Sequence, residues 1–195
     1  TVLKHLGTEE KIRQSLLAIP TGLLITLGVL VWINCAKYRN LDTLWSDTVQ
    51  KNPTSQIAHN SLGAIRSDQG LLEESQKLLL RSIQLDPEYA EAYNNLAIVH
   101  GQMGQLDKVY QSVQKAIELQ PGYAKAHFNL ATWFYRQGQL PESQATLLQA
   151  IKLDPDFFEA YNRLGLIFLE QGKRAEAILH FQQALKVNPD YEQAR

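Results

Sequence analysis

Histidine and cysteine are the side chains of this sequence best suited to nucleophilic, acid–base or metal chemistry. The chain has five histidines and a single cysteine, Cys35, so no second cysteine is available for a paired metal-ligand spacing or an intrachain disulfide. His59, His127 and His100 fall where neighbouring helices are expected to pack, and we expect His180 to lie in solvent. The sequence contains neither a glycine-rich phosphate loop nor a nucleophile elbow. It therefore predicts that the chain is not an enzyme and uses neither a metal ion nor another cofactor.

The elements that position these side chains are repeated along the chain. Prolines recur every 34 residues, at positions 53, 87, 121, 155 and 189. Glycines keep the same interval, at positions 70, 104, 138 and 172. Two residue types that share one interval of this length indicate a supersecondary unit copied end to end.

Each repeat has the pattern of a helical hairpin. When the proline is numbered 32, position 7 is always leucine and positions 8 and 27 are always small. Positions 4, 7 and 11 share one face of a first helix, and the small residues allow a second helix to approach closely. Glycine at position 15 permits the turn between them, and the proline ends the second helix. The predicted repeats are residues 56–89, 90–123, 124–157 and 158–191.

A long uncharged segment precedes the repeats. Residues 14–36 carry no charged side chain, and as a helix they span roughly 34 Å, enough for a hydrocarbon core of about 30 Å. A secretory signal has a shorter apolar core with a small-residue cleavage site, and a buried helix shows a polar stripe. We therefore predict a transmembrane helix at 14–36 after a flanking loop at 1–13. Basic residues are balanced on its two sides, so the positive-inside rule assigns no orientation.

The repeats resemble the tetratricopeptide repeat family. The fourth repeat reads AYNRLGLIFLEQGKRAEAILHFQQALKVNP from Ala160, close to the family consensus along its whole length. The resemblance covers residues 56–191. It implies an all-α protein in which one transmembrane helix is followed by a right-handed α-solenoid of helical hairpins. The usual alanine at position 20 is kept only by Ala177, and Ser75, Val109 and Ser143 replace it.

Partial repeats flank the four complete ones. Residues 38–55 fit the second half of a repeat, so we expect them to form a capping helix that joins the array closely to the membrane segment. Residues 192–195 begin a further, truncated repeat. Together with a first residue that is Thr1 rather than methionine, this pattern favours a fragment of a longer protein.

The resemblance also implies where a partner binds. In tetratricopeptide arrays first-helix positions 2, 5, 6, 9, 12 and 13 line a concave groove. Carried over to this sequence, the candidate peptide-binding residues are Asn60, Glu91, Asn94, Asn95, Lys125, Phe128, Asn129, Tyr135, Arg136, Glu159, Asn162 and Arg163. Asn95 and Asn129 occupy position 6, where some relatives bond the backbone of an extended peptide; alternatively, both are only solvated. Glu159 stands where the carboxylate clamp of chaperone-binding relatives needs lysine, so we expect no such clamp.

Two functions are consistent with this pattern. The first is a membrane-anchored scaffold that binds proteins or peptides on its concave face, with self-association through the last repeat as a further option. The second is the C-terminal, non-catalytic module of a polytopic glycosyltransferase-like protein. This alternative arises because residues 41–63 resemble the membrane-to-repeat junction of relatives of protein O-mannosyltransferases, which places the repeats on the extracytoplasmic side. A nucleic-acid partner is not expected, since residues 56–191 contain 12 basic against 15 acidic side chains.

Overall fold

The structure is a computed structural model that describes residues 40–190. In this range the chain forms nine α-helices and no strand. The helices are α2 (Leu41–Lys51), α3 (Gln56–Asp68), α4 (Leu72–Leu85), α5 (Ala90–Gln102), α6 (Leu106–Leu119), α7 (Ala124–Arg136), α8 (Leu140–Leu153), α9 (Phe158–Glu170) and α10 (Arg174–Val187). The chain divides into two compact parts, residues 1–48 and 49–195, and α2 crosses their boundary.

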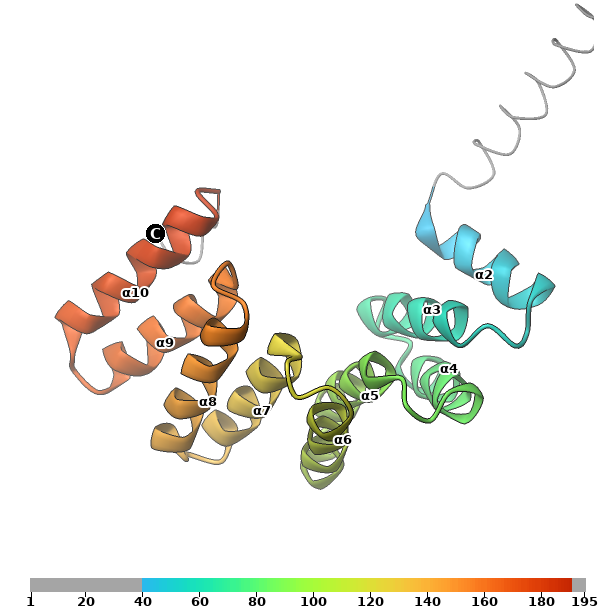
Figure 1. Cartoon of the computed structure of the whole chain (residues 1–195), viewed down its shortest axis with the longest axis horizontal. Helices are drawn as coiled ribbons and strands as arrows, with labels where there is room; N and C mark the ends of the chain where they lie inside the picture. The colour runs from blue at the N-terminus through green and yellow to red at the C-terminus, as the bar shows by residue number, and fades with distance from the viewer. Residues whose placement is uncertain (1–39, 191–195) are drawn as a thin grey trace, which may run out of the picture. The chain divides into compact units, whose positions relative to one another are not determined.

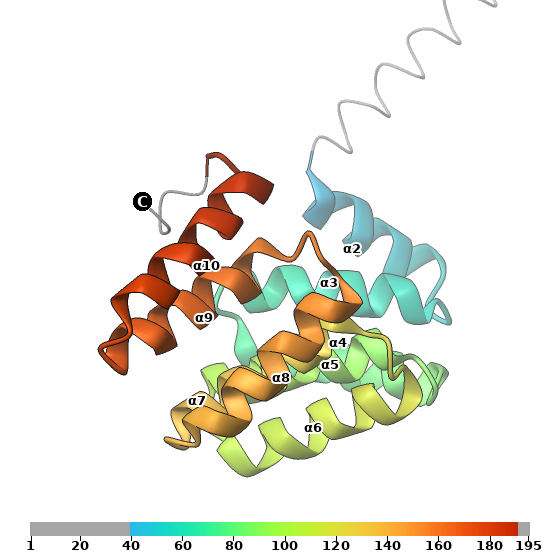
Figure 2. The same cartoon turned by 60° about the vertical axis from the view of Figure 1, so that its left-hand side comes forward.

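Helices α3 to α10 form four successive hairpins that stack into an α-solenoid (Figure 1). The first helices of the repeats, α3, α5 and α7, contact one another in sequence, and each second helix contacts the first helix of the next repeat. Each first helix also packs against the second helix of its own repeat, and Figure 2 shows the same stack from a second side. The predicted all-α solenoid is therefore confirmed.

The turn inside each hairpin depends on a glycine in the left-handed region. Gly70 has φ +76°; its N–H donates to the Ser67 carbonyl, and the N–H of Leu71 donates to the Arg66 carbonyl at 2.9 Å. This pair of bonds is the Schellman ending of a helix, which needs a residue without a Cβ penalty at positive φ. The glycines of the other three repeats adopt φ between +73° and +76°, so one turn geometry repeats along the chain.

Small residues at the crossing of the two helices bring each hairpin together. In the fourth repeat a Cβ added to Gly165 would lie 2.5 Å from Cε1 of Phe181. In the first repeat a Cβ on Gly63 would lie 2.8 Å from Cγ of Leu79, which is fully buried. Leucines at position 7, such as Leu164, are buried beside these crossings. The core of the array is therefore a line of hairpin interiors rather than one central cluster.

The serines that replace alanine at position 20 are compatible with this core. Ser75 and Ser143 are fully buried, and their hydroxyls donate to the carbonyls of Gly63 at 2.6 Å and of Ala131 at 2.8 Å. Both acceptors stand at position 8 of their repeat, where the helices cross. Each hydroxyl meets its hydrogen-bonding need within the hairpin, so burial carries no unpaired polar group.

His180 lies elsewhere than the sequence predicts. Its ring stacks on Phe168 with 5.2 Å between centroids and 4° between planes. The atom Nδ1 is buried without a hydrogen-bond partner, and burial lowers the pKa of this histidine below its usual value. The expected solvated position is wrong, because Phe168 at position 11 offers an aromatic surface that covers the ring.

The predicted segments at the two ends have different outcomes. Residues 41–51 of the half-repeat form helix α2, begun by Asn40, whose side chain accepts from the N–H of Thr43 at 2.7 Å. The flanking loop at 1–13, the transmembrane helix at 14–36 and the partial repeat at 192–195 lie outside the described residues. Between residues 40 and 190, no helix combines the length and hydropathy needed to span a bilayer.

Candidate binding groove

The predicted groove residues lie on the first helices of the four repeats, and their exposure differs. Asn60, Asn94 and Asn162 at position 5 are buried. The remaining nine are half-buried or exposed. The more accessible candidates are therefore mainly those at positions 2, 6, 12 and 13, and two of the position-5 asparagines, Asn60 and Asn94, have a different role.

That role is a hydrogen bond between neighbouring repeats. The side-chain amide Nδ2 of Asn95 donates to Oδ1 of Asn60 at 2.9 Å, and Nδ2 of Asn129 donates to Oδ1 of Asn94 at 2.7 Å. In both pairs position 6 of one repeat bonds position 5 of the repeat before it. We call these two pairs the asparagine ladder. One N–H of Asn95 and one of Asn129 are thus used inside the array.

The ladder continues into a tyrosine and a carboxylate at the edge of the groove. Nδ2 of Asn60 donates to the hydroxyl of Tyr89 at 3.4 Å, and that hydroxyl donates to Oε2 of Glu91 at 2.8 Å. Burial and the bond to Glu91 raise the pKa of Tyr89. Burial also raises the pKa of the nearby Tyr123 to about 12. Both phenols are therefore neutral donors at physiological pH, not nucleophiles.

Between the third and fourth repeats other contacts replace the ladder. Position 5 is Phe128, whose ring lies 5.1 Å from that of Phe157, and position 6 is Arg163. The guanidinium of Arg163 lies 5.7 Å from the ring centroid of Tyr135, within cation–π range. The hydroxyl of Tyr135 donates to Glu170 of the next repeat, which raises the pKa of Tyr135. Charged and aromatic side chains thus join these two repeats.

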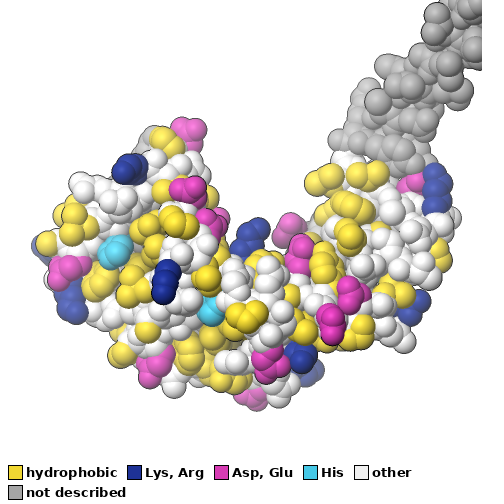
Figure 3. Space-filling model, viewed as in Figure 1, with side chains coloured by type: hydrophobic (Ala, Val, Ile, Leu, Met, Phe, Trp, Pro, Cys, Tyr) yellow, Lys and Arg dark blue, Asp and Glu magenta, His cyan; other side chains and the backbone are white. Residues whose placement is uncertain are grey.

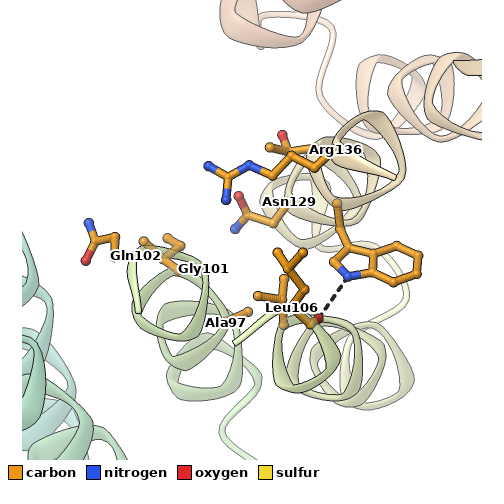
Figure 4. A pocket seen from close by; sticks show the side chains of 10 residues that line it. Ala97, Gly101, Gln102, Leu106, Asn129 and Arg136 are labelled. Atoms are coloured by element: carbon orange, nitrogen blue, oxygen red, sulfur yellow. Dashed lines mark hydrogen bonds between the residues drawn. The ribbon is translucent and has the colours of Figure 1, made fainter. Parts of the chain in front are cut away.

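The groove deepens into a pocket of about 260 Å³ between α5, α6 and α7 (Figure 4). Its lining includes the apolar side chains of Ala97, Leu106 and Trp133. Figure 4 shows Ala97 and Leu106 facing the Asn129 amide and the Arg136 guanidinium. The indole Nε1 of Trp133 donates to the carbonyl of Leu106 at 2.9 Å. We call this cavity the α5–α7 pocket.

The α5–α7 pocket exists because position 12 of the second repeat is Gly101. A Cβ at Gly101 would meet only the side chains of Arg136 and Val109, both at 3.7 Å. In the other repeats position 12 carries a side chain, as in Ser67 and Tyr135. Position 12 is one of the predicted groove positions, yet neither Gly101 nor Trp133 is among the candidate residues that the sequence indicates. In the sequence, the glycine at position 12 of the second repeat is the signal that identifies the pocket.

A smaller pocket of about 110 Å³ lies one repeat earlier, between α3 and α5. It is lined by Ala64, Ser67, Asp68, Asn95 and Ile98, which hold the same repeat positions as parts of the larger pocket. Here the hydroxyl of Ser67 donates to Oε1 of Gln102 at 2.8 Å. The two pockets follow each other along the groove at the repeat interval.

The remaining candidates are not brought into these clusters. Lys125 and Glu159, both at position 2, make no side-chain hydrogen bond or ion pair within residues 40–190. Acidic and basic side chains alternate with hydrophobic ones over the face of α3 to α10 seen in Figure 3. In that range no three His, Cys, Asp or Glu side chains are grouped to hold a metal ion. The arrangement provides hydrogen bonds, two neighbouring pockets and isolated charges.

The stacked hairpins and the groove of their first helices define a helical-repeat solenoid of the kind that presents an extended concave surface. Family models described as TPR repeat match residues 63–104 and 133–172, and models described as tetratricopeptide repeat match residues 90–123 and 158–191. The chain belongs to the tetratricopeptide repeat family.

Solved structures show the same fold. TTC0263, a thermophilic TPR protein of Thermus thermophilus, has a TM-score of 0.74 at 22% identity, covering 87% of this chain and 92% of its own. MamA has a TM-score of 0.61 at 26% identity, covering 74% of this chain and 85% of its own. YrrB, described as a TPR protein with an unusual peptide-binding site, has a TM-score of 0.58 at 18% identity, covering 86% of this chain and 85% of its own. No curated protein matches the chain.

Proposed function

We propose that this tetratricopeptide array is a non-catalytic scaffold that binds an extended peptide or protein segment on its concave face. The observation that carries the proposal is the α5–α7 pocket, which opens on the groove beside the Asn129 amide. An extended backbone exposes N–H and C=O groups that such amides bind, while pockets accept its side chains. The peptide-binding site named for YrrB is support by analogy of fold.

A selection experiment tests this function without knowledge of the natural partner. The full chain, biotinylated and kept in detergent, is incubated with a phage library of random dodecapeptides. We expect enrichment over a detergent-coated support. The Asn95→Ala/Asn129→Ala double variant should bind the enriched peptides less tightly than the parent chain, because it removes amides that face the groove. Lack of enrichment after repeated rounds would contradict the proposal.

We also propose that residues 14–36 anchor the scaffold in a membrane. The support is the absence of charge over a length that matches a bilayer core. The test is alkaline carbonate extraction of the source membranes, followed by immunoblotting with an antibody to the repeats. Retention in the membrane pellet is expected, whereas release into the supernatant with peripheral proteins would refute the anchor.

The alternative context, a module at the C-terminal end of a polytopic glycosyltransferase-like protein, is supported only by the resemblance of residues 41–63. The apparent mass of the native protein distinguishes the two. A band near the 22.1 kDa of this chain favours the simple anchored scaffold. A band several times heavier favours the module, with catalysis upstream and the repeats on the extracytoplasmic side.

A further inference from the structure

The α5–α7 pocket combines an apolar cavity with an unengaged cation. Its volume of about 260 Å³ lies below the range of about 300–1,000 Å³ that is typical for drug-sized ligands. A cavity of this size suits one apolar side chain of a larger partner. Ile98, which is 41% exposed, contributes apolar surface to both this pocket and the smaller one beside it.

The apolar wall of the pocket is held in place before any ligand binds. The bond from Trp133 to the Leu106 carbonyl fixes the indole, and the Tyr110 and Phe134 rings pack on it with centroids 4.7 Å and 5.3 Å away. A wall that needs no rearrangement reduces the entropic cost of binding. The pocket is therefore a preformed site for a side chain.

The opposite wall carries a positive charge. Arg136 is exposed, and its side chain makes no hydrogen bond or ion pair within residues 40–190. Figure 4 shows its guanidinium beside the amide of Asn129, on the same side of the pocket opening as that amide. Gln102 across the opening is also neutral. A guanidinium so placed offers two parallel N–H donors to a carboxylate.

We infer that the α5–α7 pocket binds an apolar side chain of a partner peptide that has Asp or Glu one or two residues away, with the side-chain carboxylate paired to Arg136. This inference rests on the proposed function and specifies its ligand. The carboxylate belongs to an internal residue of the segment, because the groove continues past Ile98 into the smaller pocket and the amides of Gln102 and Asn129 are placed to bind backbone on either side.

The charges along the groove also set the direction of the segment. Asp68 lines the smaller pocket one repeat earlier and repels an acidic side chain there. Arg136 lies at the α7 side of the larger pocket. The acidic residue therefore points towards α7, and the part of the peptide over α3 is neutral or basic.

The peptides enriched from the dodecapeptide library provide the probe for this inference. We expect them to share an apolar residue with Asp or Glu one or two positions away. Synthetic versions, amidated at the C-terminus so that only side-chain carboxylates remain, are then titrated against the full chain by fluorescence anisotropy. Gly101→Leu fills the pocket and Arg136→Glu reverses its charge. Each change should weaken binding by at least about tenfold, which is about 1.4 kcal/mol.

Two matched variants control for effects outside the pocket. Lys77→Glu reverses an exposed charge on the second helix α4, outside the groove formed by the first helices. Gly122→Leu adds the same side chain at a glycine where nothing lies within 4 Å of an added Cβ. Both should bind like the parent chain. A Glu→Gln or Asp→Asn change in the peptide should weaken binding to the parent but not to Arg136→Glu, and a Lys in its place should restore binding to Arg136→Glu.

The outcomes separate this inference from the proposed function. If no peptide is enriched, both are overturned. If peptides are enriched but lack the apolar–acidic pattern, or bind the parent, Gly101→Leu and Arg136→Glu equally, only this inference is overturned.

Sedimentation of the detergent-solubilised chain tests whether a second copy occupies the site instead. If the chain forms a dimer that the Gly101→Leu change dissociates, the ligand of the pocket is a second copy of this chain and not a peptide. Because Arg136 is exposed, Arg136→Glu keeps the test valid even if Gly101→Leu folds poorly.

Discussion

Gly165 in α9 and Gly101 in α5 are both helical glycines, yet they belong to two different surfaces of the first helices. Gly165 lies at a hairpin crossing, where an added Cβ would stand 2.5 Å from the ring of Phe181. Gly101 lies on the groove, where the nearest atoms to an added Cβ are 3.7 Å away. The crossing surface has nearly the same residues in every repeat, whereas the groove surface changes from junction to junction. The array thus repeats one mode of helix packing, whereas the side chains on its groove differ from one repeat to the next.

The largest effect is expected at the crossing. Gly165→Leu should lower the free energy of unfolding by about 1–3 kcal/mol, because the side chain enters space that Phe181 already fills. Thermal and urea unfolding of the full chain in detergent, followed by circular dichroism, measure the loss. Gly101→Leu is the matched control and should unfold close to the parent. Equal losses in the two variants would show that the two surfaces are not distinct.

A smaller effect is expected at the asparagine ladder. Asn129→Ala removes the donor to the buried Oδ1 of Asn94 and should cost about 1 kcal/mol. A double-mutant cycle with Asn94→Ala should give a coupling energy of about 0.5–1.5 kcal/mol. Arg163→Ala at the junction without a ladder should cost less, because its contact with Tyr135 lies near the surface. Zero coupling between Asn94 and Asn129 would remove the distinction between the junctions.

The packing surface of the second repeat contains a buried titratable side chain, His100. His100 is buried at position 11, with Nδ1 3.2 Å from the Ser112 hydroxyl and Nε2 3.2 Å from Nε2 of Gln76. Burial lowers the pKa of His100 from its usual 6.5, so below about pH 6.5 the unfolded chain binds more protons than the folded chain. The stabilisation is complete above pH 6.5 and is lost as the pH falls through the folded-state pKa.

Unfolding between about pH 7.5 and about pH 5.5 checks this dependence. Stability should fall on acidification, and the fall should be shallower in His100→Gln. Some slope should persist in that variant, since burial also lowers the pKa of His180. An unchanged slope in His100→Gln would contradict the assignment to His100.

The smallest effect on stability is expected between the third and fourth repeats, where aromatic and charged side chains stand in place of the asparagine ladder. Tyr135→Phe removes the hydroxyl that donates to Glu170 but keeps the ring under Arg163. Because the bond is exposed, the loss should be a few tenths of a kcal/mol, about that of a surface substitution. Differential scanning calorimetry should detect a shift well below that of Asn129→Ala. A larger shift would mean that the packing of the third repeat against the fourth depends on this single hydrogen bond.

The crossing surface was predictable from sequence because its constraints recur in every repeat. Gly165, Leu164 and Phe181 occupy positions whose size or apolar character is fixed by the contact of two helices. The interval of the prolines and glycines then places the hairpins. The one misplaced histidine, His180, shows the limit: its surroundings depend on Phe168, a neighbour in space that the interval alone does not reveal.

The groove was predictable only as a surface. The positions lining it follow from the family pattern, but the pairing of Asn94 with Asn129 depends on the angle between successive repeats. The α5–α7 pocket depends on a missing side chain at Gly101 and on the orientation of Trp133. Such features arise between repeats, where each pair of neighbours is different, so the repeat interval alone does not predict them.

The asparagine ladder has a consequence for how such a chain lengthens. The second repeat has asparagine at both position 5 and position 6, Asn94 and Asn95, so it donates to the repeat before it and accepts from the repeat after it. A tandem duplication of residues 90–123 would therefore supply its own joining bond at the new boundary. Such a copy adds one rung and one further groove segment in a single genetic event, with every existing contact still matched by an equivalent partner.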